Sequence, residues 1–286
     1  MTASVADDKT EVTKWTHNTK IPTYGATGWW DKSAYKEGMV LGDIWGLQFD
    51  RFLTEDDFNA DGSLKAGLPD QTKVFPAGYQ FAPGDVLYKD LDNNGEIVKQ
   101  TNTNEKGDLS VIGNALPRLQ FGLNLDAAWK GFDISMFFQG VAKRKLWAAG
   151  NQVLPGFTTG EPFYKGAEDY WTPENTDAFY PRPMDYKQSA SGNYSVNDRY
   201  LLNMAYLRLK TFTVGYSLPK VWLSKFKVQG LRVYFTGENL FTIDGVKPAI
   251  DPEIGIRTAG TSSDQRNFGR SYPYQKTVSF GIQLSL

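Results

Sequence analysis

The sequence contains no cysteine and a single histidine, so it is poor in the residues that most often carry covalent or metal chemistry. The lack of cysteine excludes disulfides, thiol nucleophiles and cysteine-based zinc sites. His17 stands in a polar stretch without a paired nucleophile, and no GxSxG, HExxH or phosphate-loop motif is present. We therefore expect neither catalytic residues nor enzymatic activity.

Charge and hydropathy exclude two further classes of protein. The 31 basic residues nearly balance the 32 acidic ones, which predicts no nucleic-acid partner. No run of about 18 apolar residues occurs, so we expect no transmembrane helix. The opening MTASVADDKTEVTKW has neither the basic nor the apolar region of a signal peptide. A membrane β-barrel stays compatible, because its strands alternate apolar and polar residues and average to a polar hydropathy.

Alternation of apolar and polar residues with a period of two, which is typical of β-strands, is the main pattern in the chain. The run QKTVSFGIQLSL places Val278, Phe280 and Ile282 on one side and polar or small residues on the other. RLQFGLNLDAAW and FDISMFF flank a turn at 130–131 and predict a hairpin with one apolar face. We expect an all-β chain with strands at roughly 10–18, 40–52, 118–129, 132–147, 203–218, 230–243 and 275–286.

The run YLRLKTFTVGYSLP alternates less simply. A strict period of two groups Arg208 and Lys210 with Phe212 and Val214, so both faces are mixed in polarity. Such a strand suits a barrel wall that crosses from an aromatic girdle to an interior. The connections between the expected strands also alternate between long and short, as in outer-membrane barrels with short periplasmic turns and long outer loops.

Six segments together resemble a known family. They are PGDVLYKDLDNNGEI, VIGNALPRLQFGLNLDAAWKGFDISMFFQGVAKRKLW, YWTPENTDAFYPRP, YLLNMAYLRLKTFTVGYSLPKVWLSKFKVQGLRVYFTGENLFTI, DPEIG and SYPYQKTVSFGIQLSL. In order and spacing, over roughly residues 37–286, they resemble the C-terminal part of SusC/RagA-type TonB-dependent outer-membrane transporters.

The resemblance implies a fold, a location and a set of partners. Members of the family have an N-terminal plug inside a barrel of the 22-stranded type. They pair with a SusD-like surface lipoprotein that acts as a lid, and the TonB complex powers their import of oligosaccharides or peptides across the outer membrane. The resemblance also places the connections 53–117, 148–202 and 244–274 outside the cell.

The chain departs from the family in what it lacks. No signal peptide, TonB box, plug motif or first part of the barrel is recognisable, and about seven strands are too few to close such a barrel around water. We therefore expect the C-terminal strands of a barrel that needs the remaining N-terminal plug and barrel portion, in contact with outer-membrane lipid. The alternative interpretation is a soluble or surface-exposed β-rich module that binds glycans.

The stretch DLDNNGEI has the opening pattern of a calcium loop. Its oxygen ligands are Asp90, Asp92, Asn94 and the carbonyl of Glu96. Gly95 allows the sharp turn, but the twelfth position is Thr101, which offers no bidentate carboxylate. Glu105 or Asp108 is the alternative closing ligand. No cofactor is required by the rest of the sequence, and the competing interpretation of this stretch is a solvated Asn-Gly turn without metal.

The segment GFTTGEPFYKGAEDYWTPENTDAFYPRPMDY is rich in aromatic residues. Exposed rings stack on sugar faces or anchor a partner protein. The candidate contacts with substrate or lid are Trp171, Tyr180, Tyr170 and Phe163. The competing interpretation is that these rings pack the long loop against its neighbours.

Overall fold

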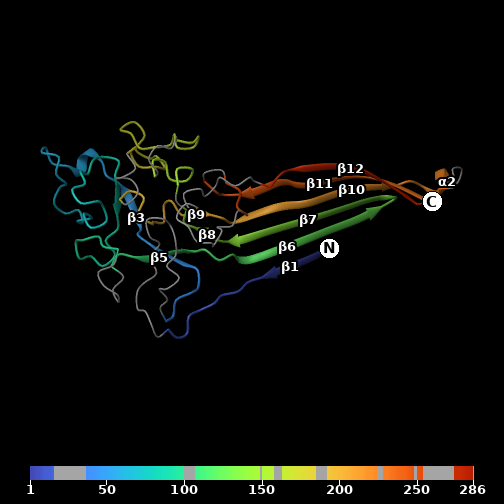
Figure 1. Ribbon diagram of the computed structural model, residues 1–286, viewed down its shortest axis with the longest axis horizontal. Coiled ribbons are helices and arrows are strands. Elements are labelled where there is room, and N and C mark those ends of the chain that lie inside the picture. The colour runs from blue at the N-terminus through green and yellow to red at the C-terminus, as the bar shows by residue number, and fades with distance from the viewer. Residues whose placement is uncertain are drawn as a thin grey trace.

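The computed structural model describes residues 1–15, 37–99, 107–148, 150–157, 163–184, 192–223, 228–247, 250–253 and 274–285. Six antiparallel strands form one open sheet in the order β1-β6-β7-β10-β11-β12. They are β1 (Thr2–Ala6), β6 (Arg118–Trp129), β7 (Phe132–Lys143), β10 (Tyr206–Ser217), β11 (Gly230–Asp244) and β12 (Thr277–Ser285). In Figure 1 this sheet occupies one half of an elongated molecule. The chain is therefore nearly all β, as expected.

No helix in the described ranges has both the length and the apolarity needed to cross a membrane. The helical elements within the described residues are η1 (Glu55–Asp57) and α2 (Lys220–Leu223).

One face of the large sheet is apolar from edge to edge. The register aligns Ile134, Val214, Phe235 and Phe280 in a row across four strands, since paired residues share a face. Many of these side chains have no cover within the described chain. The exposed large apolar residues of this face are Val5, Trp129, Phe132, Ile134, Val233, Phe241, Ile243, Val278, Phe280, Ile282 and Leu284. An exposed apolar surface of this extent marks a region that contacts another apolar phase or partner.

The opposite face of the sheet is polar. Asp126, Ser135, Thr213 and Thr236 lie in one row, and Ser279 continues it on β12. Within the row Ser135 donates a hydrogen bond to Asp126 (2.7 Å), and the hydroxyls of Thr213 and Thr236 lie 3.1 Å apart. The sheet thus has two unlike faces along its whole width.

A β-bulge explains why the sequence of β10 looked mixed. Its register shifts between Leu209 and Thr211 against both neighbouring strands, and Lys210 is an extra residue relative to β7. Beyond the bulge the alternation is reset, and Phe212 joins the apolar face of Leu209 rather than the face of Arg208. The prediction of mixed faces was wrong because it assumed an unbroken period of two.

Some strands lie elsewhere than the sequence indicated. The expected strand at 40–52 is divided into β2 (Asp43–Gly46) and β3 (Phe49–Phe52), which pair outside the large sheet with β5 (Ser110–Asn114) and β4 (Val86–Tyr88). The N-terminal strand lies at β1 rather than at 10–18, where Glu11 forms an isolated bridge and residues 16–18 lie outside the described ranges. The 132–147 segment ends in β8 (Lys145–Leu146), which pairs with β9 (Leu202–Asn203).

All three long connections leave the same end of the sheet. They join β1 to β6, β7 to β10 and β11 to β12, and we call their described residues the loop region. Figure 1 shows the loop region at one end, and α2 and the C-terminus at the other. At that other end β6 and β7 are joined by Lys130 and Gly131, both at positive φ (46° and 89°), as a tight hairpin turn requires.

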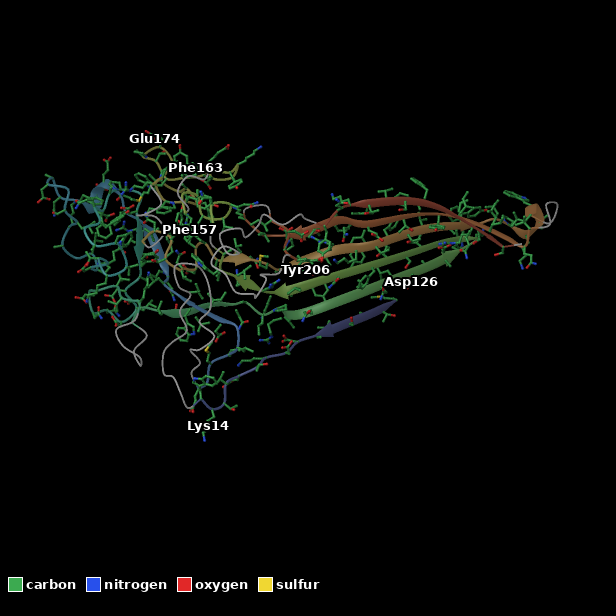
Figure 2. All side chains as sticks on the ribbon, viewed as in Figure 1. Lys14, Asp126, Phe157, Phe163, Glu174 and Tyr206 are labelled. Atoms are coloured by element: carbon green, nitrogen blue, oxygen red, sulfur yellow. The ribbon has the colours of Figure 1, made fainter. Side chains whose placement is uncertain are left out.

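Among the described residues both hydrophobic core clusters lie in the loop region, and the large sheet contributes only Val141, Tyr206 and Leu209 to the buried apolar side chains. A first cluster gathers around Trp147, Tyr180, Tyr194 and Tyr200, and a second around Tyr88, Ile97 and Trp171. The loop region is thus a packed structure in its own right. Figure 2 shows its dense side chains around Phe157 and Phe163, whereas Asp126 lies far along the sheet.

Candidate functional site

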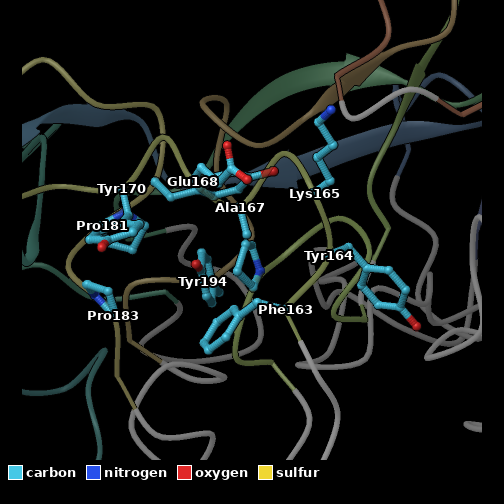
Figure 3. A pocket seen from close by; sticks show the side chains of 11 residues that line it. Phe163, Tyr164, Lys165, Ala167, Glu168, Tyr170, Pro181, Pro183 and Tyr194 are labelled. Atoms are coloured by element: carbon cyan, nitrogen blue, oxygen red, sulfur yellow. The ribbon is translucent and has the colours of Figure 1, made fainter.

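A pocket of about 560 Å³ opens in the loop region and is lined by the segment that connects β8 to β9 in the sequence (Figure 3). Pockets of this size that are lined mainly by apolar and aromatic side chains are the usual form of a binding site for a small group. Its lining consists of Pro155, Phe163, Tyr164, Lys165, Ala167, Glu168, Tyr170, Tyr180, Pro181, Pro183 and Tyr194. The segment is therefore concave and not merely rich in aromatic residues.

The inner wall of the pocket is fixed by aromatic packing. Tyr180 and Tyr194 are each 4% exposed, and both pack on Tyr200, with ring centroids 6.0 and 5.3 Å away. The hydroxyl of Tyr180 donates a hydrogen bond to the carbonyl of Val153 (3.0 Å). Burial raises the pKa of Tyr180 to about 12, and the charge of Asp169 adds to the shift. This wall is rigid, and the Tyr180 hydroxyl is already engaged.

The outer margin of the pocket is more open. Phe163 is 59% exposed and Tyr170 is 40% exposed. Lys165 and Glu168 belong to a turn in which the amide of Ala167 donates to the carbonyl of Tyr164 (3.0 Å). In Figure 3 the rings of Phe163 and Tyr194 lie in the centre of the lining, and Lys165 points away from them. The margin therefore combines exposed aromatic rings with one positively charged side chain, Lys165, and one negatively charged side chain, Glu168.

The four predicted contact residues are divided by the structure. Phe163, Tyr170 and Tyr180 line the pocket, whereas Trp171 is 7% exposed and belongs to the second core cluster. A side chain on Gly84 would clash with the Trp171 ring, so the two residues pack in close contact. The contact roles of all four residues stay predictions. Tyr194 was not singled out, because no local pattern places it beside the aromatic segment. The three prolines of the lining lie within that segment or directly before it, but nothing in their sequence marks them as pocket residues.

The acidic stretch forms a second cluster in the loop region. The carboxylates of Asp90, Asp92 and Asp108 each offer an oxygen within 4.8 Å of the others. Asp90 accepts hydrogen bonds from the amides of Gly95 (2.8 Å) and Asn94 (3.3 Å), which curl the chain around it. Asp108, one of the two closing ligands expected from sequence, is thereby placed beside the first two aspartates. Glu105 lies outside the described residues.

The side chains of the other two predicted residues point to local partners, whereas the predicted ligand atom of Glu96 is its backbone carbonyl. The amide oxygen of Asn94 accepts a hydrogen bond from the amide of Glu96 (2.7 Å), and the Glu96 carboxylate is paired with Lys73. Buried Asp108 is held in place by the amides of Leu91 (2.8 Å) and Val98 (2.7 Å). The carboxylate set that converges is therefore Asp90, Asp92 and Asp108.

The electrostatic environment of these three carboxylates favours the binding of a cation among them. Desolvation raises the pKa of Asp92, and the neighbouring charges of Asp108 and Asp90 act in the same direction. Desolvation also acts on Asp90, but hydrogen bonds from the amides of Gly95, Asn93 and Asn94 outweigh it and lower its pKa. Hard cations such as calcium prefer oxygen ligands of this kind.

No protein-family model matches the chain. It is 29% identical over 258 residues to TonB-dependent receptor P3 of Formosa agariphila, covering 87% of the chain and 22% of that receptor. It is 24% identical over 242 residues to TonB-dependent receptor SusC of Bacteroides thetaiotaomicron, covering 81% of the chain and 22% of SusC. The chain thus spans about a fifth of the length of the curated relatives it matches.

The fold also resembles solved structures. The RagAB peptide importer in the closed-closed state superposes with a TM-score of 0.58 and 20% identity, over 99% of this chain and 26% of that one. The named relatives are receptors and a transporter and not enzymes, in agreement with the expected lack of catalysis.

Proposed function

Because the chain belongs to the SusC/RagA-type TonB-dependent receptors, we propose that it is the C-terminal part of an outer-membrane importer of oligosaccharides or peptides. The rest of that importer would be an N-terminal plug and the remaining strands of a barrel of the 22-stranded type. The open edges of β1 and β12 are where those strands would pair. The loop region would then lie outside the cell, and the short turns in the periplasm.

The observation that supports this proposal most is the pair of unlike faces on the large sheet. A barrel wall needs an apolar face toward lipid and a polar face toward a water-filled interior, in strict alternation. The row of Ile134, Val214, Phe235 and Phe280 meets the first need, and the row that begins at Asp126 meets the second. A soluble glycan-binding module would leave the apolar row in water, which disfavours that alternative.

The proposed partners follow from the family and from the loop region. A SusD-like lipoprotein would close over the outer loops, and the TonB complex would act through the missing N-terminal part. The aromatic pocket and its rings Phe163, Tyr170 and Tyr180 are the proposed contacts with substrate or lid. Trp171 would act indirectly, by holding the segment on the core.

Fractionation and uptake test this function together. The transporter that contains this chain should be found in the outer membrane, migrate differently in gels before and after heating, and copurify with a surface lipoprotein. Its deletion should abolish uptake of one oligosaccharide or peptide nutrient and leave uptake of free monosaccharides and amino acids unchanged. Recovery of the protein in the soluble fraction, or unchanged uptake of every nutrient, would contradict the proposal.

We also propose that calcium or a similar hard cation binds Asp90, Asp92 and Asp108 and stiffens this outer loop. Calcium should slow amide exchange in residues 90–98, and chelation should reverse the effect. Asp92→Ala should weaken calcium binding by about tenfold or more, since it removes one of three charged ligands. Asp61→Ala, in another exposed turn of the loop region, serves as the matched control.

The pH dependence of this cation site has a defined sign. The pKa of Asp92 is raised without a cation, so acidification adds a proton to Asp92 early and removes one ligand charge. Calcium affinity should therefore fall as the pH decreases toward the ordinary range of aspartate, measured by calorimetry. Equal calcium protection at neutral and acidic pH, or in Asp92→Ala, would show that the stretch is a plain turn.

A further inference from the structure

The aromatic pocket has the chemistry of a receptor for an apolar side chain. Its inner wall offers carbon surface from Tyr180, Tyr194 and three prolines, and the Tyr180 hydroxyl is engaged by the carbonyl of Val153. A group that enters this part of the pocket gains burial of apolar surface but finds few hydrogen-bond partners. The charged groups Lys165 and Glu168 lie at the margin, where a ligand would stay in contact with water.

These features discriminate between ligand classes. A sugar ring that filled the pocket would bring hydroxyls against the inner wall, and each buried hydroxyl without a partner is unfavourable. An aromatic or large aliphatic side chain has no such groups, and its backbone would stay at the margin. There Lys165 can donate to a peptide carbonyl, and Glu168 can accept from a peptide amide.

The pocket is also largely preformed. The Tyr180 and Tyr194 rings are held by Tyr200, and Pro155, Pro181 and Pro183 restrict the backbone of the same wall. Little conformational entropy would be lost in this wall on binding, and the side chains left to be ordered are the exposed ones at the margin, Phe163, Tyr170, Lys165 and Glu168. A small apolar group can therefore bind with useful affinity.

We propose that this pocket binds one bulky apolar side chain presented by an extended polypeptide. The proposal rests on the proposed contact role of the aromatic segment. It narrows the class of ligand from glycan or polypeptide to polypeptide alone. Two sources present the same chemistry, namely a free peptide and a segment of the lid lipoprotein.

Matched tripeptides test the proposal on the full transporter in detergent, where binding needs neither import nor energy. We expect Ac-Ala-Phe-Ala-NH2 to bind and Ac-Ala-Ala-Ala-NH2 to bind at least about tenfold more weakly, because the ring supplies the apolar burial. Maltose in excess should not compete. Phe163→Ala should weaken binding about tenfold through loss of an aromatic contact. Ala167→Trp, which fills the pocket, should abolish binding.

Ala66→Trp places the same bulky side chain at an exposed position of the loop region outside the pocket and should leave the affinity unchanged. Competition by maltose, equal binding of both tripeptides, or full binding by Ala167→Trp would overturn the proposal.

The same binding measurement on the transporter purified with its lipoprotein identifies the source of the side chain. If that complex no longer binds the tripeptide, a side chain of the lid lipoprotein occupies the pocket. If the complex still binds the tripeptide, the pocket is open to a free peptide. Failed import with intact tripeptide binding would count against the transport function and not against the pocket.

Discussion

Replacement of Asp85 by alanine is expected to loosen the outer part of the loop region by about 3 kcal/mol, the lower end of the usual effect of removing one partner of a buried ion pair, because the remaining partner Arg182 is 27% exposed. Asp85 is fully buried, and its carboxylate accepts hydrogen bonds from Tyr79 (2.8 Å), Arg182 (2.8 Å) and Asn193 (2.9 Å). The amide of Ala82 donates to the second oxygen (2.9 Å). In the variant these donors remain buried or half-buried without their common acceptor.

Amide hydrogen exchange measures this effect where it should be largest. The amide of Val86 donates to the side chain of Asn193 (2.8 Å), and the amide of Arg182 donates to the carbonyl of Gly84 (3.1 Å), so both report on the Asp85 network. Their protection should fall in Asp85→Ala. Asp56→Ala, at an exposed carboxylate in the same region, should change the free energy of opening by less than about 0.5 kcal/mol. Unchanged protection of Val86 in Asp85→Ala would refute this role of the network.

The Asp85 network also shows what sequence reasoning does not reach. Asp85 and Asn193 are 108 residues apart, and Asn193 lies outside all six segments that resemble the family, so nothing local indicates that the two share a buried site. The same holds for Tyr194, which completes the pocket. By contrast, the hairpin of β6 and β7 could be predicted, because its alternation and its turn are both local. Long-range contacts between loops depend on packing that a single sequence does not encode in any periodic form.

The errors among the strands have equally physical causes. The segment at 40–52 has strand-like residues, but its partners are β4 and β5 within the loop region, so it adds nothing to the large sheet. β1 has only five residues, so its alternation is too short to stand out in the sequence, and the strand is defined by its pairing with β6. The bulge at Lys210 reverses the alternation in the middle of a strand. In the acidic stretch the spacing indicated Asp90 and Asp92 correctly as neighbours, and only the fold could choose Asp108 as the third carboxylate.

The second large effect is expected on the apolar face of the sheet. Phe280 is 82% exposed in the middle of β12, and its ring lies 5.2 Å from that of Phe235. If this face contacts lipid, Phe280→Arg places a charge in the hydrocarbon layer and should destabilise the folded transporter by about 2–4 kcal/mol. In a soluble protein the same change at so exposed a position would be nearly neutral.

Ser279→Arg is the matched control, because Ser279 is the adjacent residue and lies on the polar face, opposite Thr236. A charge there would remain in water, so this variant should unfold in denaturant within about 1 kcal/mol of the parent transporter when both are refolded into lipid vesicles. The difference between the two variants depends only on which face receives the arginine. Equal stability of both in vesicles would mean that the apolar face is not in contact with lipid, and the barrel interpretation of the chain would then fail.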